Sequence, residues 1–198
     1  MQRRQILTLI AAACGPSTRA ASARDVAVLT RVDTELGAFV IAVDPRVAPL
    51  TVANYLAYVD HGDLDQGSVY RVVTPANQGP ETKYRIEVVQ WGMDLPDDAQ
   101  PPRPPVAHET TQQTGLRHRD GTVSMARNGP GTATGEFFIC IGDQPELDYG
   151  GHRNPDGQGF AAFGQVVEGM DVVRALYARG GDDQYLQPAI VVRTVRRV

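Results

Sequence analysis

Short apolar runs separated by turn-forming residues recur along most of this chain. The runs are rich in Val, Ile, Phe and Tyr, and most are bounded by Gly, Pro, Asp or Asn, a pattern typical of β-strands. We expect strands over 26–32, 37–44, 68–73, 85–92, 121–129, 135–142, 160–169 and 189–198. The turn-like "DTELG" between the first two predicts a hairpin.

A helical period of apolar residues appears twice between these runs. In residues 45–62, apolar side chains fall at i, i+3, i+4 and i+7 and so share one face of a helix. These residues are Val52, Tyr55, Leu56 and Val59. Thr51 is the predicted N-cap, and Gly62 ends the helix. A second helix is predicted over 169–180, with Met170, Val173 and Tyr177 on one face and Gly180 as its stop.

Strands dominate this pattern, so the sequence predicts one mainly β domain over 26–198. A sheet with so few helices must bury one face, and closure into a barrel removes its exposed edges. Glycine (20) and proline (14) are frequent enough for many turns. The proline-rich segment 95–108 is predicted to be a rigid surface loop; the alternative is a polyproline ligand for a partner.

Charge and cysteine content exclude several classes of protein. The net charge of −4 and the pI of about 5.5 give no electrostatic support to nucleic-acid binding. Neither Cys14 nor Cys140 belongs to a CxxC or Cys/His ligand spacing, so we predict no metal site. Cys140 lies in an apolar run and is expected to be buried. The glycine-rich "NGPGTATG" lacks the Gly-Lys-Ser/Thr ending of a phosphate loop, so we expect no nucleotide cofactor.

The N-terminus has the pattern of an export signal. Residues 1–14 combine a basic start, an apolar run and small residues before a cysteine. "AAAC" is similar to a bacterial lipoprotein signal, in which Cys14 becomes the lipidated first residue. The pair Arg3-Arg4 also resembles a twin-arginine signal, and the alternative is a frayed cytoplasmic N-terminus. Residues 15–25 are predicted to form a flexible tether.

Two of the strand-like runs carry a polar residue among apolar ones. Arg71 lies inside "SVYRVV", and Gln90 lies inside "VVQWGMD". A charge and an amide on two neighbouring strands predict one polar site on one face of the sheet.

Several segments of this chain, taken in order, resemble the cyclophilin family of peptidyl-prolyl cis-trans isomerases. They are "SVYRVV", "VVQWGMD", "GTVSMARNGPGTATGEFFICIGDQPELD" and "GFAAFGQVVEGMDVV". The resemblance covers about residues 26–198 and is most specific from Gly121 to Val173. It implies a closed barrel of eight antiparallel strands capped by two α-helices, working without a metal or cofactor.

The resemblance also implies roles for individual residues. Arg71 matches the catalytic arginine that donates to the prolyl nitrogen, and Gln90 matches the glutamine that positions it. The substrate-binding positions are Phe138, Leu147, Ala126, Val88, Phe160 and Glu136. Phe138 matches the floor of the proline pocket, and Val88 stands where the family has a methionine.

Besides Val88, other residues near the implied site depart from the family's pattern. Glu87 stands where a pocket phenylalanine is common, and Glu136 replaces a glutamine. We expect the Glu136 carboxylate to pair with Arg71, which would slow turnover, or with Arg127; the sequence does not choose between them. Trp91 replaces a glycine and is expected either to shield the site or to take the place of the missing aromatic.

Together, the resemblance and the N-terminal signal pattern predict an isomerase that assists protein folding in the periplasm or cell envelope, held at a membrane only by a lipid on Cys14. Its expected partners are proline-containing peptides and unfolded or partly folded envelope proteins, bound by a monomer. The alternative is a cyclophilin-like module that grips proline-containing segments with little turnover. A metal-dependent hydrolase using His108, His118 and His152 has no ligand spacing behind it.

Overall fold

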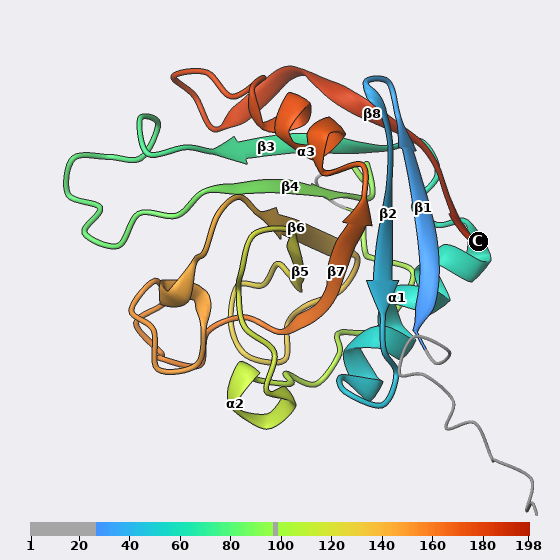
Figure 1. The fold of residues 1–198 in the computed structure, drawn as a ribbon, viewed down its shortest axis with the longest axis horizontal. Helices are drawn as coiled ribbons and strands as arrows, with labels where there is room; N and C mark the ends of the chain where they lie inside the picture. The colour runs from blue at the N-terminus through green and yellow to red at the C-terminus, as the bar shows by residue number, and fades with distance from the viewer. Residues whose placement is uncertain (1–26, 97–98) are drawn as a thin grey trace, which may run out of the picture.

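Eight strands close into a barrel in the computed structural model, which describes residues 27–96 and 99–198 (Figure 1). The order around the barrel is β1-β2-β7-β5-β6-β4-β3-β8, and every adjacent pair is antiparallel. The strands are β1 (Val28–Thr34), β2 (Gly37–Val43), β3 (Gly67–Val73), β4 (Val88–Gly92), β5 (Thr122–Met125), β6 (Glu136–Cys140), β7 (Ala162–Glu168) and β8 (Tyr185–Arg197). The predicted mainly β barrel is confirmed, whereas the predicted signal segment and tether lie outside the described residues.

The two neighbouring phenylalanines of β6 point to opposite faces of the sheet. Phe137 is fully buried inside the barrel, where its ring centroid lies 5.2 Å from that of Trp91 and 5.9 Å from that of Phe163. Phe138 belongs to a separate apolar cluster on the outer face. Successive side chains of a strand alternate between faces, so one ring fills the barrel core and the other serves a site outside it.

Helix α1 (Pro49–His61) begins two residues before the predicted N-cap, so that prediction is wrong. Pro49 fits the first helical position because a backbone N–H there would have no intrahelical acceptor, so proline loses no hydrogen bond by lacking one. Thr51 therefore lies within the first turn, where its backbone N and its Oγ1 each donate to Glu109 Oε2 at 2.7 Å. The Glu109 carboxylate thus caps the helix from a distant loop. Gly62 ends the helix in the left-handed conformation, as predicted.

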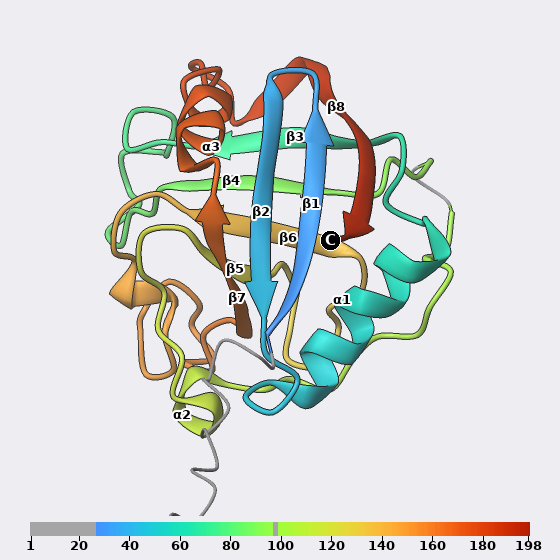
Figure 2. The same cartoon turned by 45° about the vertical axis from the view of Figure 1, so that its right-hand side comes forward.

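Helix α3 (Met170–Tyr177) begins after Gly169 as predicted but ends at Tyr177, three residues before the predicted stop at Gly180. Helices α1 and α3 lie near opposite ends of β2 (Figure 2). Two short turns were not predicted: α2 (Thr111–Thr114) and the 3₁₀ helix η2 (Pro145–Leu147). Each spans only about one helical turn, which is too short for an amphipathic pattern to repeat, so periodicity does not reveal them.

Strand β8 begins at Tyr185, four residues earlier than predicted. Pro188 lacks an N–H donor, which argues against a strand across this position, so the sequence did not predict residues 185–188 as part of it. Strand β3, which pairs with β8, shifts register between Val69 and Arg71, and this bulge accommodates the extra residues of β8. No helix in residues 27–96 and 99–198 is both long and apolar enough to cross a membrane.

Candidate active site

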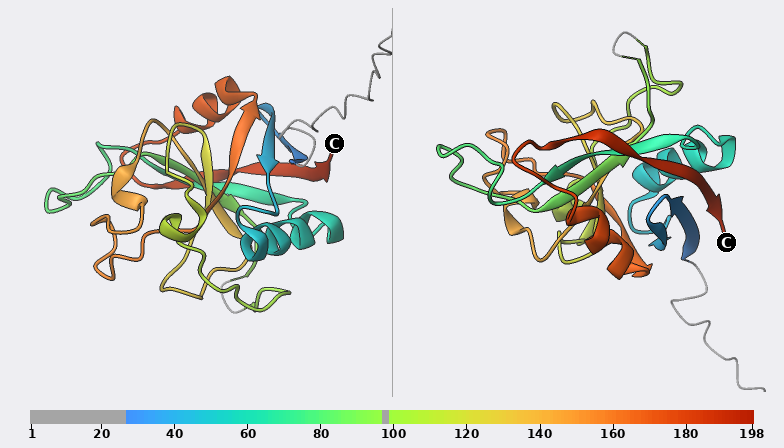
Figure 3. Two further views of the ribbon diagram at one scale, coloured as in Figure 1. Left: turned by 60° about the horizontal axis from the view of Figure 1, so that its bottom comes forward. Right: turned by 90° about the horizontal axis from the view of Figure 1, so that it is seen from above.

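A pocket opens on the outer face of β3, β4 and β6. It lies toward the loops before β4 and β7, which project on the side of the barrel away from α1 and the C-terminus (Figure 3). Its volume of about 450 Å³ suits a short peptide segment. The residues predicted for the site all line it: Arg71, Gln90, Phe138, Leu147, Ala126, Val88, Phe160 and Glu136. The fold therefore brings together residues that are up to 89 positions apart in the chain (Arg71 to Phe160).

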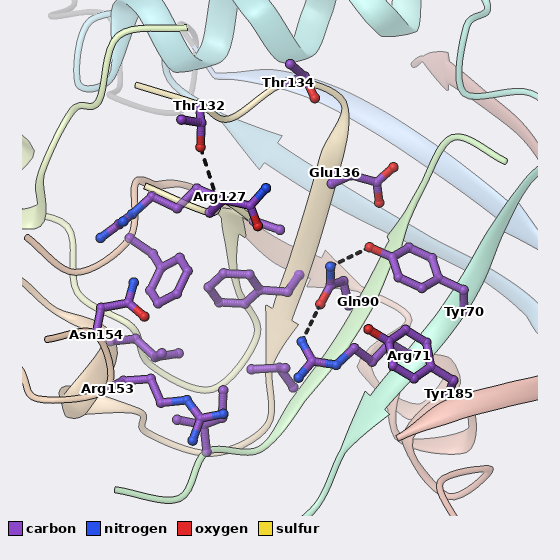
Figure 4. Close-up of a pocket in the computed structure, with 17 residues that line it drawn as sticks. Tyr70, Arg71, Gln90, Arg127, Thr132, Thr134, Glu136, Arg153, Asn154 and Tyr185 are labelled. Carbon is purple, nitrogen blue, oxygen red and sulfur yellow. Dashed lines mark hydrogen bonds between the residues drawn. The ribbon is translucent and has the colours of Figure 1, made fainter. Parts of the chain in front are cut away.

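The Arg71 side chain is held by two amide oxygens. Arg71 lies opposite Gln90 in the β3–β4 register, and its Nη1 donates to Gln90 Oε1 at 3.0 Å (Figure 4). Its Nε and Nη2 donate to Gln184 Oε1 at 3.0 and 2.5 Å. Gln90 in turn donates through Nε2 to the Tyr70 hydroxyl, and Gln184 donates to Asn77 O at 3.0 Å. Both amides are therefore oriented with their oxygens toward the guanidinium.

This arrangement leaves part of the Arg71 guanidinium free for a ligand. A guanidinium carries five N–H donors, and three of them reach Gln90 or Gln184. Within residues 27–96 and 99–198, the other two N–H groups have no acceptor. A pocket-facing cation with two fixed, unused donors can stabilise negative charge or a lone pair that develops on a bound molecule.

The rest of the pocket floor is apolar. Phe138 packs with Val88, Leu147, Ile86 and Phe160, and its ring meets that of Phe160 edge to face at 5.3 Å. These side chains come from β4, β6 and η2 and from the residues just before β4 and β7. Cys140 is fully buried beneath them, as predicted, and burial raises the pKa of its thiol. An apolar slot beside a cation is the arrangement that the resemblance implied.

A buried polar network supports Phe138 from behind. The His118 ring stacks on the Phe138 ring with centroids 5.9 Å apart and planes at 16°. His118 Nδ1 lies 2.8 Å from Asp148 Oδ1, and Nε2 lies 2.9 Å from Ser124 Oγ. Burial alone would raise the pKa of Asp148, but hydrogen bonds from the His118 side chain and backbone outweigh it, so the pKa is lowered. Both ring nitrogens are occupied, which fixes the ring against Phe138.

Comparison with protein families identifies this barrel and pocket. The family model described as "Cyclophilin type peptidyl-prolyl cis-trans isomerase/CLD" matches residues 29–196. The chain belongs to the cyclophilin family. It is 34% identical over 168 residues to peptidyl-prolyl cis-trans isomerase cyp18 of Streptomyces antibioticus, covering 81% of this chain and 93% of that protein. It is 32% identical to peptidyl-prolyl cis-trans isomerase B of Escherichia coli, covering 71% and 78% of the two chains. The family and these relatives make the chain a peptidyl-prolyl cis-trans isomerase.

A solved cyclophilin has the same fold. A crystal structure of a cyclophilin-type peptidyl-prolyl cis-trans isomerase from Cryptosporidium parvum superposes with a TM-score of 0.66 at 16% identity. The superposition covers 87% of this chain and 98% of that one. At this identity the likeness concerns the fold, and it agrees with the closed barrel described above.

In this cyclophilin, Glu136 pairs with neither arginine, so the predicted ion pair is wrong. The side-chain hydrogen bonds of Arg71 go to Gln90 and Gln184, as described above. Arg127 is turned toward the β7 side, where its Nη1 lies 2.8 Å from Asp156 Oδ2 and its Nε donates to Gly159 O. Glu136 lies on the other side of Gln90 from Arg71 (Figure 4). Glu136 therefore does not compete for the N–H groups of Arg71, and the expected slowing of turnover has no basis in this structure.

The other two departures also leave the site undisturbed. Glu87 is not among the lining residues, and its Oε2 accepts a 2.5 Å hydrogen bond from the Tyr177 hydroxyl of α3. Ile86, the preceding residue, takes a place in the pocket. Trp91 is 1% exposed and packs inside the barrel against Phe39 and Phe137. It neither shields the pocket nor substitutes for a pocket aromatic, because side chains alternate along β4 and Gln90 occupies the outer face.

Several residues of this cyclophilin's pocket were not predicted. They include Tyr70, Ile86, Arg153 and Tyr185, and Gln184, which positions Arg71 without being a lining residue. Arg153 donates to Gln78 Oε1 and Tyr84 O at 3.1 Å each; burial, and then the nearby Arg71, lowers its pKa. The sequence could have revealed Ile86, because it lies two residues before Val88 and four before Gln90 and so shares their face of the predicted strand. Gln184 and Arg153 lie in loops and carry no periodic signal.

No three His, Cys, Asp or Glu side chains in residues 27–96 and 99–198 gather as metal ligands. His108 faces the Gln158 carbonyl at 3.1 Å, whereas His152 Nδ1 faces Glu146 at 2.9 Å. His118 contacts Asp148 and Ser124 as described above. The three histidines of the hydrolase alternative thus have three separate sets of partners.

Proposed function

We propose that this cyclophilin rotates Xaa-Pro bonds in the pocket around Arg71, with the proline ring on Phe138 and an Arg71 N–H directed at the prolyl nitrogen. The observation that carries the proposal is the guanidinium held by Gln90 and Gln184, with two donors left over, beside an apolar slot. We further propose that its clients are unfolded or partly folded proteins of the cell envelope.

The chemistry follows from the electronic structure of the amide. Resonance gives the bond a rotational barrier of about 18–20 kcal/mol. At the twisted transition state this resonance is lost, and the prolyl nitrogen becomes pyramidal with a free lone pair. A donor aimed at that nitrogen binds the twisted form better than either planar form, which is the condition for catalysis. No bond is broken, so the reaction needs no nucleophile.

The surrounding residues restrict what moves during rotation. Phe138, Leu147 and Val88 supply an apolar slot that holds the proline ring, so the preceding carbonyl is the part that turns. Gln90 and Gln184 fix Arg71 before the substrate arrives, so little reorganisation is needed at the transition state. This division of roles is the mechanism that the geometry supports best.

A protease-coupled assay of the full chain with a short Ala-Pro peptide tests this function. We expect the cis isomer to be consumed faster than its uncatalysed exchange, which takes tens of seconds. Added chelator should leave the rate unchanged. The alternative, a binding module with little turnover, drew support from Glu87 and Glu136, and neither side chain contacts Arg71. Peptide binding without any acceleration would establish that alternative.

Gln184 is a positioning residue for Arg71, and its removal should lower kcat. Gln184→Ala deletes the acceptor of two Arg71 hydrogen bonds. Loss of about 0.5–1.5 kcal/mol of hydrogen bonding corresponds to a two- to tenfold lower rate. The proline slot is untouched, so KM should change little. The exposed Gln112, which makes no side-chain hydrogen bond in the described structure, provides the control variant Gln112→Ala. An unchanged kcat in Gln184→Ala would show that Gln90 alone positions Arg71.

We also propose that the chain is exported and lipidated at Cys14, on the strength of the sequence pattern in residues 1–14. In a bacterial host, fractionation should place the wild-type protein in the envelope, and Cys14→Ser should release it or block its processing. The other cysteine gives the control, because Cys140→Ser should leave the location unchanged. Recovery of intact, unprocessed wild-type protein from the cytoplasm would refute export.

A further inference from the structure

Glu136 is a carboxylate in the pocket wall that pairs with no cation in the part of the chain that the structure describes. It lies at the start of β6, two residues before Phe138 and on the same face of the strand. Its Oε2 is fully buried and has no hydrogen-bond donor among the described residues. It takes part in no salt bridge there, since the two guanidinium groups that were its expected partners are engaged elsewhere.

The backbone of β4 makes room for this carboxylate. Gly92 pairs with Glu136 across β4 and β6, and a Cβ atom at Gly92 would lie only 2.5 Å from Glu136 Oε2. The absence of a side chain at position 92 lets the carboxylate pack against the strand. A buried acceptor in this position is costly until a donor reaches it.

The electrostatic surroundings favour an incoming positive charge. Burial raises the pKa of Glu136 to about 7; the Tyr70 hydroxyl opposes this shift and the nearby Asp94 carboxylate adds to it. The groups that face Glu136 are Tyr58 of α1, Tyr70 of β3 and Asp94 after β4. Burial raises the pKa of both tyrosines, so they stay neutral near pH 7. Near pH 7 the Glu136 carboxyl group is therefore divided between its ionised and protonated forms, and a positively charged ligand favours the ionised one.

The spacing along β6 places Glu136 within reach of a residue close to the bound proline. Two residues of a strand span about 7 Å, and an extended peptide advances about 3.3–3.6 Å per residue. With the proline ring on Phe138, a side chain one or two positions away lies beside Glu136. Lysine and arginine are long enough to bring a cationic donor to the carboxylate.

We propose that Glu136 is a specificity-determining residue, which selects substrates with Lys or Arg within two residues of the isomerised proline. This proposal rests on the proposed function of the pocket. The cation of the substrate stabilises the ionised form of the Glu136 carboxyl group, which burial disfavours. A neutral side chain gives no such stabilisation, so the enzyme discriminates between basic and neutral substrates.

The preference depends on the charge of Glu136. Because its pKa is about 7, the carboxyl group is mostly ionised at pH 8 and mostly protonated at pH 6, whereas a substrate lysine is charged at both. The preference for a basic substrate should therefore weaken from pH 8 to pH 6. A preference that grows as the pH falls would contradict the assignment to Glu136.

The test compares kcat/KM for peptides that carry either lysine or the neutral norleucine at each of the two positions on either side of the proline. At pH 8 and physiological salt, wild type should prefer the lysine peptide about tenfold at one or more positions, a factor that corresponds to one charge-assisted hydrogen bond. In Glu136→Gln the ratio should fall to about one. Glu87→Gln removes an acid just before β4 that lies outside the pocket, and it should keep the full ratio.

The outcomes separate this inference from the proposed function. If wild type turns over neither peptide, the proposed function fails. If it turns over both equally at every position, only the role of Glu136 fails. A tenfold preference that survives in Glu136→Gln would also overturn the assignment, since another group would then be binding the cation.

Discussion

Replacing Arg71 by alanine should lower kcat/KM for a short Xaa-Pro peptide by about 100- to 1,000-fold, the usual cost of removing one preorganised transition-state donor. The guanidinium is the charged donor that Gln90 and Gln184 hold in place beside the apolar slot. Alanine keeps the slot and both amides but leaves nothing to meet the lone pair of the prolyl nitrogen. A protease-coupled assay on the full chain measures the loss.

Arg71→Lys is the informative companion to this variant. Lysine retains the charge, but a single ammonium group cannot bond both amides in the guanidinium geometry and still present fixed donors. We expect it to recover only a small part of the activity. Circular dichroism and the midpoint of urea unfolding should show that both variants remain folded. Wild-type turnover in Arg71→Ala would mean that the pocket around Arg71 is not the catalytic site.

Asp148→Ala should lower the free energy of unfolding by about 2–4 kcal/mol, the range for leaving buried donors unsatisfied. Asp148 Oδ1 accepts hydrogen bonds from the His118 backbone N at 3.1 Å and from Nδ1 at 2.8 Å. Without the carboxylate, both groups are buried beneath Phe138 with no acceptor. Urea unfolding at pH 7 measures the change, and the exposed Asp182→Ala should stay within about 0.5 kcal/mol of wild type.

The effect of Asp148 should depend on pH in a defined direction. Its pKa is lower in the folded protein than the ordinary value of 3.8. A carboxylate whose pKa is depressed by folding contributes its stability above the unfolded pKa, and the contribution is lost as the pH falls through the folded pKa. The difference between wild type and Asp148→Ala should therefore be constant near neutral pH and shrink below about pH 4. A difference that widens in acid would contradict the role given to this carboxylate.

The strand pattern of the sequence predicts much of the fold because the barrel depends on alternation. All eight strands occur where apolar runs were found, with bounds that differ by a few residues. The anomalies in two of those runs, Arg71 and Gln90, prove to be neighbours across β3 and β4. A polar residue on the outer face of a strand leaves the barrel core unchanged, so the sequence can place a site there without losing the fold.

The side-chain partners were predicted less well, because they depend on residues far apart in the chain. Gln184, which holds Arg71, lies 113 residues after it in a loop. The carboxylates of Glu136 and Glu87 were expected near the reaction, yet Glu87 turns to Tyr177 of α3. Trp91 was linked to the site by its position after Gln90, whereas the alternation of β4 sends it into the barrel. Such contacts are set by packing in three dimensions and leave no trace in local periodicity.

The location of a bound proline tests the central claim most directly. Intermolecular NOEs can be measured between the full chain and an Ala-Pro peptide whose proline carries ¹³C. The account predicts NOEs from the proline ring to the aromatic protons of Phe138 and Phe160, the two rings that meet edge to face in the pocket. A proline ring that contacts neither of them, and instead lies against another surface of the barrel, would contradict it.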